Sequence, residues 1–210
     1  DSISPQADMR GVNLAGVRLS TTGFTGLFDN TTVFSVQNGG LSIGANLSGS
    51  SALMQTLNLG NTDFRGVNLT GVNLADANLT NALFDQTTVF SANVGGLQQG
   101  VNLSYTGANL STLDLSSKDF RGVNLAGVNL SNTNLTSALF DVTTVFSGLH
   151  GGTGQRMGAN LSNTTNNGAL LDSISPQADM RGVNLAGVRL STTGFTGLFD
   201  NTTVFSVQNG

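Results

Sequence analysis

The sequence predicts an all-β fold, a β-solenoid or parallel β-helix with irregular glycine-rich corners. Three observations predict it: an identical duplication with a period of 171 residues, a shorter module inside that period, and an apolar residue at every fifth position. Long helices are not expected, because the 210 residues include 28 glycines and only 10% charged residues.

The duplication sets the organisation of the chain. Residues 1–39 recur without change as residues 172–210. Solenoid proteins usually end in atypical capping units, whereas these two segments are the same. We therefore expect one continuous solenoid over residues 1–210, cut as a window from a longer array.

A seven-residue marker, Asp-(Met/Phe)-Arg-Gly-Val-Asn-Leu, divides the period into modules. It begins at Asp8, Asp63, Asp119 and Asp179. The modules are therefore about 8–62, 63–118 and 119–178, followed by a partial copy at 179–210 that is identical to 8–39. Repeats of this length indicate stacked units that bury their faces only against their neighbours.

A period of five residues predicts the shape of each coil. It fits neither the helical period of 3.6 nor the strand period of 2.0, so the chain has to turn once per five-residue step, here called a pentad. One large side chain then points inward on each side of a four-sided coil. The predicted core residues are Leu14, Leu19, Phe24, Val33, Phe64, Leu69, Leu74, Leu79, Phe84, Val89, Phe120, Leu125, Leu130, Leu135, Phe140, Val145, Leu185 and Leu190.

The pentads resemble those of the pentapeptide-repeat proteins, whose pattern is Ala-(Asp/Asn)-Leu-X-X. Residues 77–81 and 108–112 match this pattern, and residues 67–71 and 123–127 match it with Val in place of Ala. The resemblance implies a quadrilateral β-solenoid and says little about function. Some members of that family protect gyrase by imitating DNA, which implies a soluble module that binds a partner protein as an alternative.

Glycine-rich stretches interrupt the pentads at residues 38–40, 95–96 and 151–152. Glycine reaches positive φ at little cost and suits tight reversals. We expect irregular corners or small protruding loops there. Phe24 and Phe28 lie only four residues apart, so the corner between them should also be distorted.

Composition argues against several classes of function. A net charge of −4, from 12 acidic and eight basic residues, supplies neither the basic patch that nucleic-acid binding needs nor the acidic rows of a DNA mimic. No stretch suggests membrane insertion. Cysteine is absent and His150 is the single histidine, so we expect no enzymatic activity, no cofactor and no metal site.

The charges of the marker have two interpretations. They are Asp8 and Arg10, Asp63 and Arg65, Asp119 and Arg121, and Asp179 and Arg181. Solvated ion pairs that stabilise the fold by under about 1 kcal/mol each are one interpretation. The other is a lateral interface: if a module is a whole number of coils, the four pairs line one face of the rod.

Asn-Leu-Ser/Thr triplets, for example at Asn46 and Asn78, fit the acceptor pattern for glycans. The pentad pattern itself produces such triplets, because it places Asn before Leu and allows Ser or Thr after it. We therefore do not expect glycosylation, but glycans stay open as an alternative. The function that these observations favour is structural. We expect an extracellular or cell-surface fibre, filament, sheath or adhesin stalk that assembles with itself, end to end or laterally, as coils continue.

Overall fold

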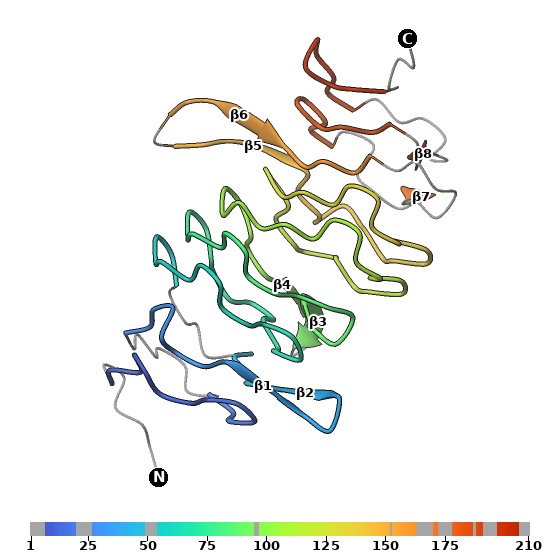
Figure 1. Cartoon of the computed structure of the whole chain (residues 1–210). Helices are drawn as coiled ribbons and strands as arrows, with labels where there is room; N and C mark the ends of the chain where they lie inside the picture. Colours follow the sequence, from blue (N-terminus) through green and yellow to red (C-terminus); the bar gives the residue numbers. More distant parts are fainter. Residues whose placement is uncertain are drawn as a thin grey trace.

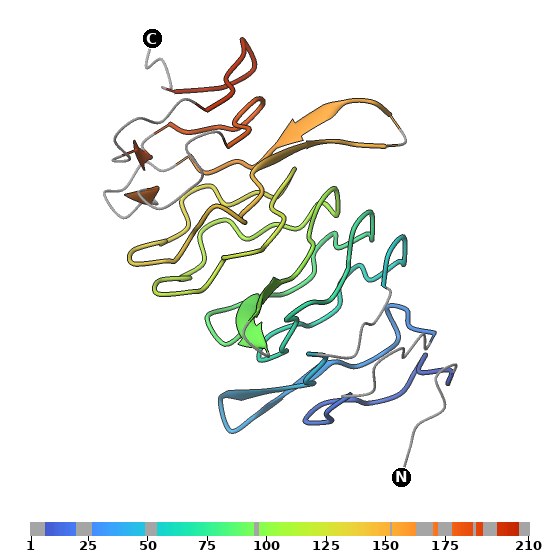
Figure 2. The ribbon, with the colours of Figure 1, turned by 180° about the vertical axis from the view of Figure 1, so that it is seen from behind.

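The computed structural model describes residues 7–19, 27–48, 54–94, 97–151, 153–162, 170–171, 178–186, 188–190 and 197–205. Over these residues the chain contains no helix and climbs as a stack of coils from one end to the other (Figures 1 and 2). None of them forms a helix long and apolar enough to cross a membrane. The predicted all-β solenoid is confirmed.

Parallel bridges between successive coils hold the stack together. Asn58 pairs with Asn78, and Asp63 pairs with Leu83. Each pair is 20 residues apart, which is four pentads, so a regular coil has four sides. Stacked bridge residues form columns along the axis, such as the one through Asn109, Asn129, Asn160, Asn184 and Val204.

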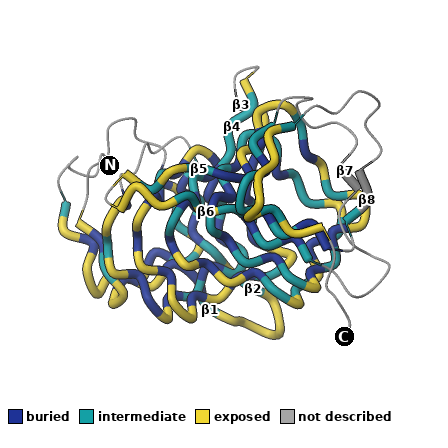
Figure 3. The backbone as a smooth tube through the Cα atoms, turned by 90° about the horizontal axis from the view of Figure 1, so that it is seen from above, coloured by how far each residue is buried: buried dark blue, intermediate teal, exposed yellow. Residues whose placement is uncertain are grey.

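Each corner follows from a short local hydrogen bond. The N–H of Val67 donates to the carbonyl of Phe64 at 3.1 Å, and the N–H of Val72 donates to the carbonyl of Leu69 at 2.9 Å. Glycine or a short polar residue takes positive φ in many of these turns, as at Gly66 and Asn81. The turn directs two side chains inward per pentad, a large one and a smaller one two residues before it, and both are buried in most pentads. Buried and exposed positions accordingly alternate along the coils (Figure 3).

Most of the predicted core residues are buried in this interior. They are Leu14, Leu19, Phe64, Leu69, Leu74, Leu79, Phe84, Phe120, Leu125, Leu130, Leu135, Phe140 and Leu185. Phe24 lies outside the described residues, as does the side chain of Leu190.

The prediction was wrong for Val33, Val89 and Val145. Val33 and Val145 are exposed and Val89 is half-buried, while the residue after each, Phe34, Phe90 and Phe146, is buried.

An extra residue in the turn before each valine causes the shift. Asp85 shows the arrangement: its carboxylate accepts hydrogen bonds from the N–H and hydroxyl of Thr87, and its carbonyl accepts from the N–H of Thr88 at 3.1 Å. The turn therefore starts one residue later than in a regular pentad. The Thr88 side chain faces inward and donates to the carbonyl of Phe64 at 3.0 Å.

Three antiparallel hairpins follow the buried phenylalanines. They are β1 (Ser35–Asn38) with β2 (Leu41–Gly44), β3 (Ser91–Val94) with β4 (Leu97–Gly100), and β5 (Ser147–Leu149) with β6 (Arg156–Gly158). A short parallel pair, β7 (Leu170–Leu171) with β8 (Arg189–Leu190), lies near the end of the chain. The predicted irregular corners are thus β-hairpins that leave the coil and return to it.

Successive hairpins leave from different sides of the rod. The β1–β2 and β5–β6 hairpins project in opposite directions in both side views (Figures 1 and 2). Each hairpin returns to the point where it left, because the N–H of Ala45 donates to the carbonyl of Phe34 at 2.7 Å, and the N–H of Val101 to that of Phe90 at 2.8 Å. The coil thus continues as if the hairpin were absent.

Candidate functional site: the module junction

Each hairpin packs on the marker of the following module. Gly44, at the end of the first hairpin, lies against Gly66, and a Cβ on Gly44 would lie 2.2 Å from the Gly66 carbonyl carbon. The same contact joins Gly100 to Gly122, and Gly158 to Gly182. A side chain does not fit at Gly44, Gly100 or Gly158, so the glycine at the end of each hairpin allows close backbone packing on the marker.

Backbone and hydroxyl hydrogen bonds fix this contact. The first residue of each hairpin is a serine whose hydroxyl donates to the carbonyl of the marker arginine: Ser35 to Arg65 at 2.5 Å, Ser91 to Arg121 at 2.5 Å, and Ser147 to Arg181 at 2.6 Å. The marker asparagine then pairs with the chain leaving the hairpin. Asn124, for example, donates to the carbonyl of Val101 at 3.1 Å and accepts from the N–H of Leu103 at 3.0 Å.

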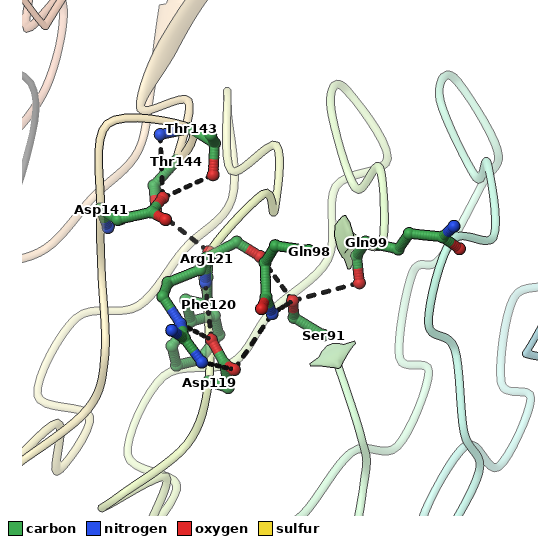
Figure 4. A network of polar contacts seen from close by, with 9 residues as sticks. All are labelled: Ser91, Gln98, Gln99, Asp119, Phe120, Arg121, Asp141, Thr143 and Thr144. Atoms are coloured by element: carbon green, nitrogen blue, oxygen red, sulfur yellow. Dashed lines mark hydrogen bonds and ion pairs between the residues drawn. The ribbon is translucent and has the colours of Figure 1, made fainter. Parts of the chain in front are cut away.

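The marker charges form an ion pair within each marker, and at the second and third junctions the marker carboxylate also contacts a hairpin side chain. Arg121 donates to Asp119 at 2.7 Å, and the Gln98 amide of β4 donates to the same carboxylate at 3.1 Å (Figure 4). At the third junction Arg156 of β6 takes the place of Gln98 and contacts Asp179 at 2.6 Å.

These contacts lower the pKa of the marker carboxyls. For Asp179 the hydrogen bond from the Arg181 side chain lowers the pKa most, burial opposes it, and the Arg181 N–H and the charge of Arg156 lower it further. For Asp119 burial is the largest influence and raises the pKa, but the hydrogen bonds from Arg121 and Gln98 together outweigh it. The carboxylates are therefore ionised at neutral pH.

The hairpins also contact the coil before them. Ile43 lies over Gly16, Gln99 over Gly71 and Met157 over Gly127, and all three glycines have positive φ. Each of these glycines comes eight residues after a marker aspartate, and the glycine beneath the hairpin end comes three residues after one. One hairpin therefore fastens three successive coils.

The third hairpin carries an additional contact that the other two lack. The Nε2 of His150 lies 2.9 Å from the Asp76 carboxylate, and the ring of His150 packs edge-on against Tyr105 at 4.9 Å between centroids. The single histidine thus ties the tip of this hairpin to an earlier turn.

The marker pairs do not line one face. In the second module the bridge residues Asp63, Asn68, Asn73, Asn78, Leu83, Val89, Asn102, Asn109, Asp114 and Asp119 make nine steps. With four steps per coil, a module is two coils and a quarter, not a whole number.

The columns place all four markers on successive sides. Arg18 and Asn68 lie in one column, on the same side of the coil. Asp8 lies two pentads before Arg18 and Asp63 one pentad before Asn68, so Asp8 and Asp63 lie on neighbouring sides. In the same way Asp119 lies two pentads before Asn129 and Asp179 one before Asn184, in a shared column. The predicted single-face lateral interface of Asp8, Arg10, Asp63, Arg65, Asp119, Arg121, Asp179 and Arg181 is therefore wrong, because the four pairs lie on four successive sides of the coil.

The first marker has the same sequence as the fourth but carries no hairpin among the described residues. Val12 is 37% exposed, whereas Val67, Val123 and Val183, the equivalent residues, are fully buried. A Cβ on Gly11 would meet nothing within 4 Å. The side chains of Asp8 and Arg10 are about half exposed, and their ion pair of 2.6 Å is solvated.

The opposite end of the described chain is open as well. Phe205 is 55% exposed and Phe199 38%, although their counterparts in the first copy, Phe34 and Phe28, are buried at 0% and 3%. A following coil covers Phe34, because Phe64 stacks on it at 5.4 Å.

Comparison with known proteins agrees with this geometry. Residues 57–86 and 106–141 match the family model for pentapeptide repeats, in 8 copies. These segments lie between the hairpins, where the four-sided coils are regular. These two segments of the chain are pentapeptide repeats.

Solved pentapeptide-repeat proteins are similar to this chain over much of its length. A trypsin-treated form of QnrB1, described as a plasmid-mediated fluoroquinolone resistance protein, is 16% identical, with 93% of this chain and 87% of that one covered and a TM-score of 0.34. HetL, involved in heterocyst differentiation regulation in the cyanobacterium Nostoc, is 19% identical over 96% and 88%, with a TM-score of 0.32.

Rfr23 from the cyanobacterium Cyanothece is 24% identical over 69% of this chain and 88% of that one, with a TM-score of 0.28. Comparison with curated proteins gives no match. The assignment of residues 57–86 and 106–141 to pentapeptide repeats therefore rests on the family-model match and not on these alignments. No group of three or more metal-ligating side chains occurs among the described residues.

Sequence reasoning found the marker but missed its role. The available signal was the glycine pair at the third and eighth residues after each marker aspartate, which recurs in every module. Spacing alone does not show what packs on those glycines, since the hairpins come from the preceding module or lie later in the same one.

Proposed function

We propose that this pentapeptide-repeat chain is a structural protein: a segment of a rod that serves as an extracellular or cell-surface fibre, filament, sheath or adhesin stalk. The rod grows by continuation of its coils or by end-to-end contact with another copy, and its partner is itself. No catalytic role is proposed.

The observation that carries this proposal is the repeated junction. At three places a hairpin fastens the coil before it and the marker after it with the same glycine contacts, although the surrounding faces differ. A protein whose repeated residues join successive modules is suited to a rod that carries mechanical load.

Exposed strand edges also favour continuation. A terminal coil presents unpaired N–H and C=O groups, which template pairing with another chain. Within the stack these groups are paired, as in the bond from the N–H of Leu79 to the carbonyl of Thr106 at 3.0 Å. Adding a coil therefore satisfies backbone groups and buries apolar side chains together.

Electron microscopy of the purified chain over a range of concentrations tests the rod. We expect filaments one coil stack wide, in amounts that increase with concentration. Short, monodisperse particles at every concentration would contradict it. Immunogold labelling of intact cells tests the location, and label confined to the cell interior would overturn the extracellular assignment.

A second candidate is a soluble interaction module that binds a partner protein. The favouring observation is one strongly exposed leucine on each hairpin: Leu41 at 73%, Leu97 at 69% and Leu149 at 58%. Under this alternative the chain stays monomeric, and replacing the three leucines by serine abolishes partner binding. Under the rod proposal the same replacement leaves filaments intact.

A further inference from the structure

The β5–β6 hairpin lies along one corner of the coil stack. That corner is continuous, because the N–H of Asp76 donates to the carbonyl of Ser104 and the N–H of Tyr105 donates to that of Ala126, both at 3.0 Å. Asp76, Tyr105 and Ala126 therefore belong to three successive coils. The hairpin begins at Ser147, in the next coil of the stack.

The contacts of the hairpin follow this corner from coil to coil. A Cβ on Gly148 would lie 3.6 Å from the Cβ of Ala126, and the His150 ring packs edge-on against Tyr105 at 4.9 Å between centroids. The Nε2 of His150 then reaches the Asp76 carboxylate at 2.9 Å. The hairpin thus spans from its own coil to the third coil before it.

One face of the hairpin carries these contacts. Gly148 and His150 are two residues apart in extended chain and share a face, whereas Leu149 between them is 58% exposed. The His150 side chain is only 25% exposed, although it lies toward the tip of a hairpin. Its Nδ1 accepts from the N–H of Thr153 at 3.2 Å, so the ring proton lies on Nε2 and points to Asp76.

The fit over Tyr105 requires a glycine in the hairpin. A Cβ on Gly148 would lie 2.4 Å from the Tyr105 hydroxyl oxygen but 3.5 Å from its Cζ, which is an ordinary contact distance. The corresponding residues of the first and second hairpins are Val36 and Ala92, which carry such a Cβ. Neither of those two hairpins could close over a tyrosine in the same way.

The four residues of this contact come together once in the 171-residue period. Equivalent positions are found by counting from the marker, from the Asn-Leu element and from the first serine of the hairpin. They hold Thr21 and Asn132 for Asp76, Gly49 and Asn163 for Tyr105, and Asn38 and Val94 for His150. Because the modules are otherwise so similar, residues that differ together at four positions indicate one specific contact.

We propose that the β5–β6 hairpin is a strap that Gly148, His150, Tyr105 and Asp76 latch onto the corner shared by the second and third modules. While the latch is closed, the coils beneath the strap cannot part at this corner, so the two modules loosen as one unit. The strap is a clamp against bending and extension of the stack. It acts within one chain and goes beyond the proposed function, because it does not depend on assembly.

The latch can open while the coils stay folded. The base of the hairpin is held separately, by the ion pair of Arg156 and Asp179 at 2.6 Å and by the packing of Gly158 on Gly182. The latch itself consists of a glycine–tyrosine contact, a ring contact and one hydrogen bond to the half-exposed Asp76. A substitution at the latch therefore separates opening of the strap from unfolding.

Two spectroscopic probes report the latch without any label. The chain has one tyrosine, one histidine and no tryptophan, so its fluorescence comes from Tyr105 and its imidazole NMR signals come from His150. We expect Gly148→Ala to increase acrylamide quenching and to move the imidazole signals to those of an unstacked ring. The ratio of closed to open strap should fall about tenfold or more, equivalent to about 1.4 kcal/mol.

Matched variants separate the latch from a general loss of stability. Gly151→Ala is the control, because a Cβ there meets nothing within 4 Å, and it should change neither probe. Gly148→Ala/Tyr105→Phe removes the hydroxyl oxygen that obstructs the new Cβ, and it should return the His150 signals to their closed positions. His150→Ala should increase the quenching of Tyr105 with the circular dichroism spectrum unchanged.

Hydrogen exchange tests the clamp. The N–H groups of Tyr105 and Asp76 join the coils beneath the strap, so they should exchange faster in Gly148→Ala, whereas the N–H of Leu47, bonded to Asn68 at 2.9 Å, should not. Equal effects of Gly148→Ala and Gly151→Ala, or no rescue by Tyr105→Phe, would overturn the latch. An open latch with unchanged exchange at Tyr105 and Asp76 would overturn the clamp. All these outcomes are read on single chains, so failure of the filament test leaves them unaffected.

Discussion

At the scale of the residue, the inward position in each pentad decides stability. Phe120 stacks between Phe90 at 5.3 Å and Phe140 at 5.4 Å between ring centroids. At four points among the described residues, aromatic contacts pass to the next side of the coil: Phe28 meets Phe34, Phe84 meets Phe90, Phe140 meets Phe146, and Phe199 meets Phe205. The phenylalanines therefore wind around the axis with the modules.

The neighbours Val145 and Phe146 test the inward assignment. Phe146 is 1% exposed and Val145 40%. We expect Phe146→Ala to lower the free energy of unfolding by about 3–5 kcal/mol, and Val145→Ala to lower it by less than about 1 kcal/mol. Urea unfolding followed by circular dichroism measures both, and a larger loss for Val145→Ala would restore the unbroken five-residue register.

This pair also shows where sequence reasoning stops. Val145 and Phe146 are both apolar and adjacent, and a strict period of five selects the valine. The structure selects the phenylalanine because Asp141 accepts hydrogen bonds from Thr143, which inserts one residue into the turn. A search for regularly spaced apolar residues does not detect a turn that a polar side chain caps and lengthens.

Acid should weaken the junctions. The pKa of Asp179 is lowered in the folded chain, first by the Arg181 side chain, so the stabilisation is present above the unfolded value of about 3.9 and is lost as pH falls through the folded value. We expect the stability difference between the unmodified chain and Asp179→Asn to shrink as pH decreases from about 5 to about 2. A difference that is constant over this range in urea titrations would rule out this role.

At the scale of the element, the hairpins are inserts that depend on glycine. A Cβ on Gly100 would lie 2.3 Å from the Gly122 carbonyl carbon, whereas a Cβ on Gly60 would meet nothing closer than 3.4 Å. The sequence located these elements by their glycines. It did not reveal that the chain forms a hairpin there and then rejoins the coil. A ten-residue hairpin and two pentads have the same length, so the residue count alone does not distinguish them.

Gly100→Ala should therefore open the second junction. We expect a loss of about 1–3 kcal/mol or more from overpacking against backbone, while the matched Gly60→Ala should change stability by less than about 1 kcal/mol. Hydrogen exchange provides a local readout, since the N–H of Asn124 should lose protection in Gly100→Ala alone. Equal effects of the two substitutions would show that the hairpin does not press on the marker.

At the scale of the whole molecule, the quarter-turn offset organises the rod. Dividing the module length by five does not predict this offset, because the residues in the hairpins and in the longer turns do not form sides of the coil. The bridges correct the count: Asn73 pairs with Asn102, 29 residues away, instead of with the residue 20 positions on. This offset distributes the hairpins and the marker charges around the axis, so no side is unique.

The most direct test of this solenoid is the partner of Asn73. In a chain without native cysteine, Asn73→Cys/Asn102→Cys should form an intramolecular disulfide, because neighbouring strands lie about 4.8 Å apart and this separation suits the bond. Asn73→Cys/Asn93→Cys should remain reduced, since Asn93 lies in the hairpin strand β3. A disulfide between positions 73 and 93, and none between 73 and 102, would contradict the account.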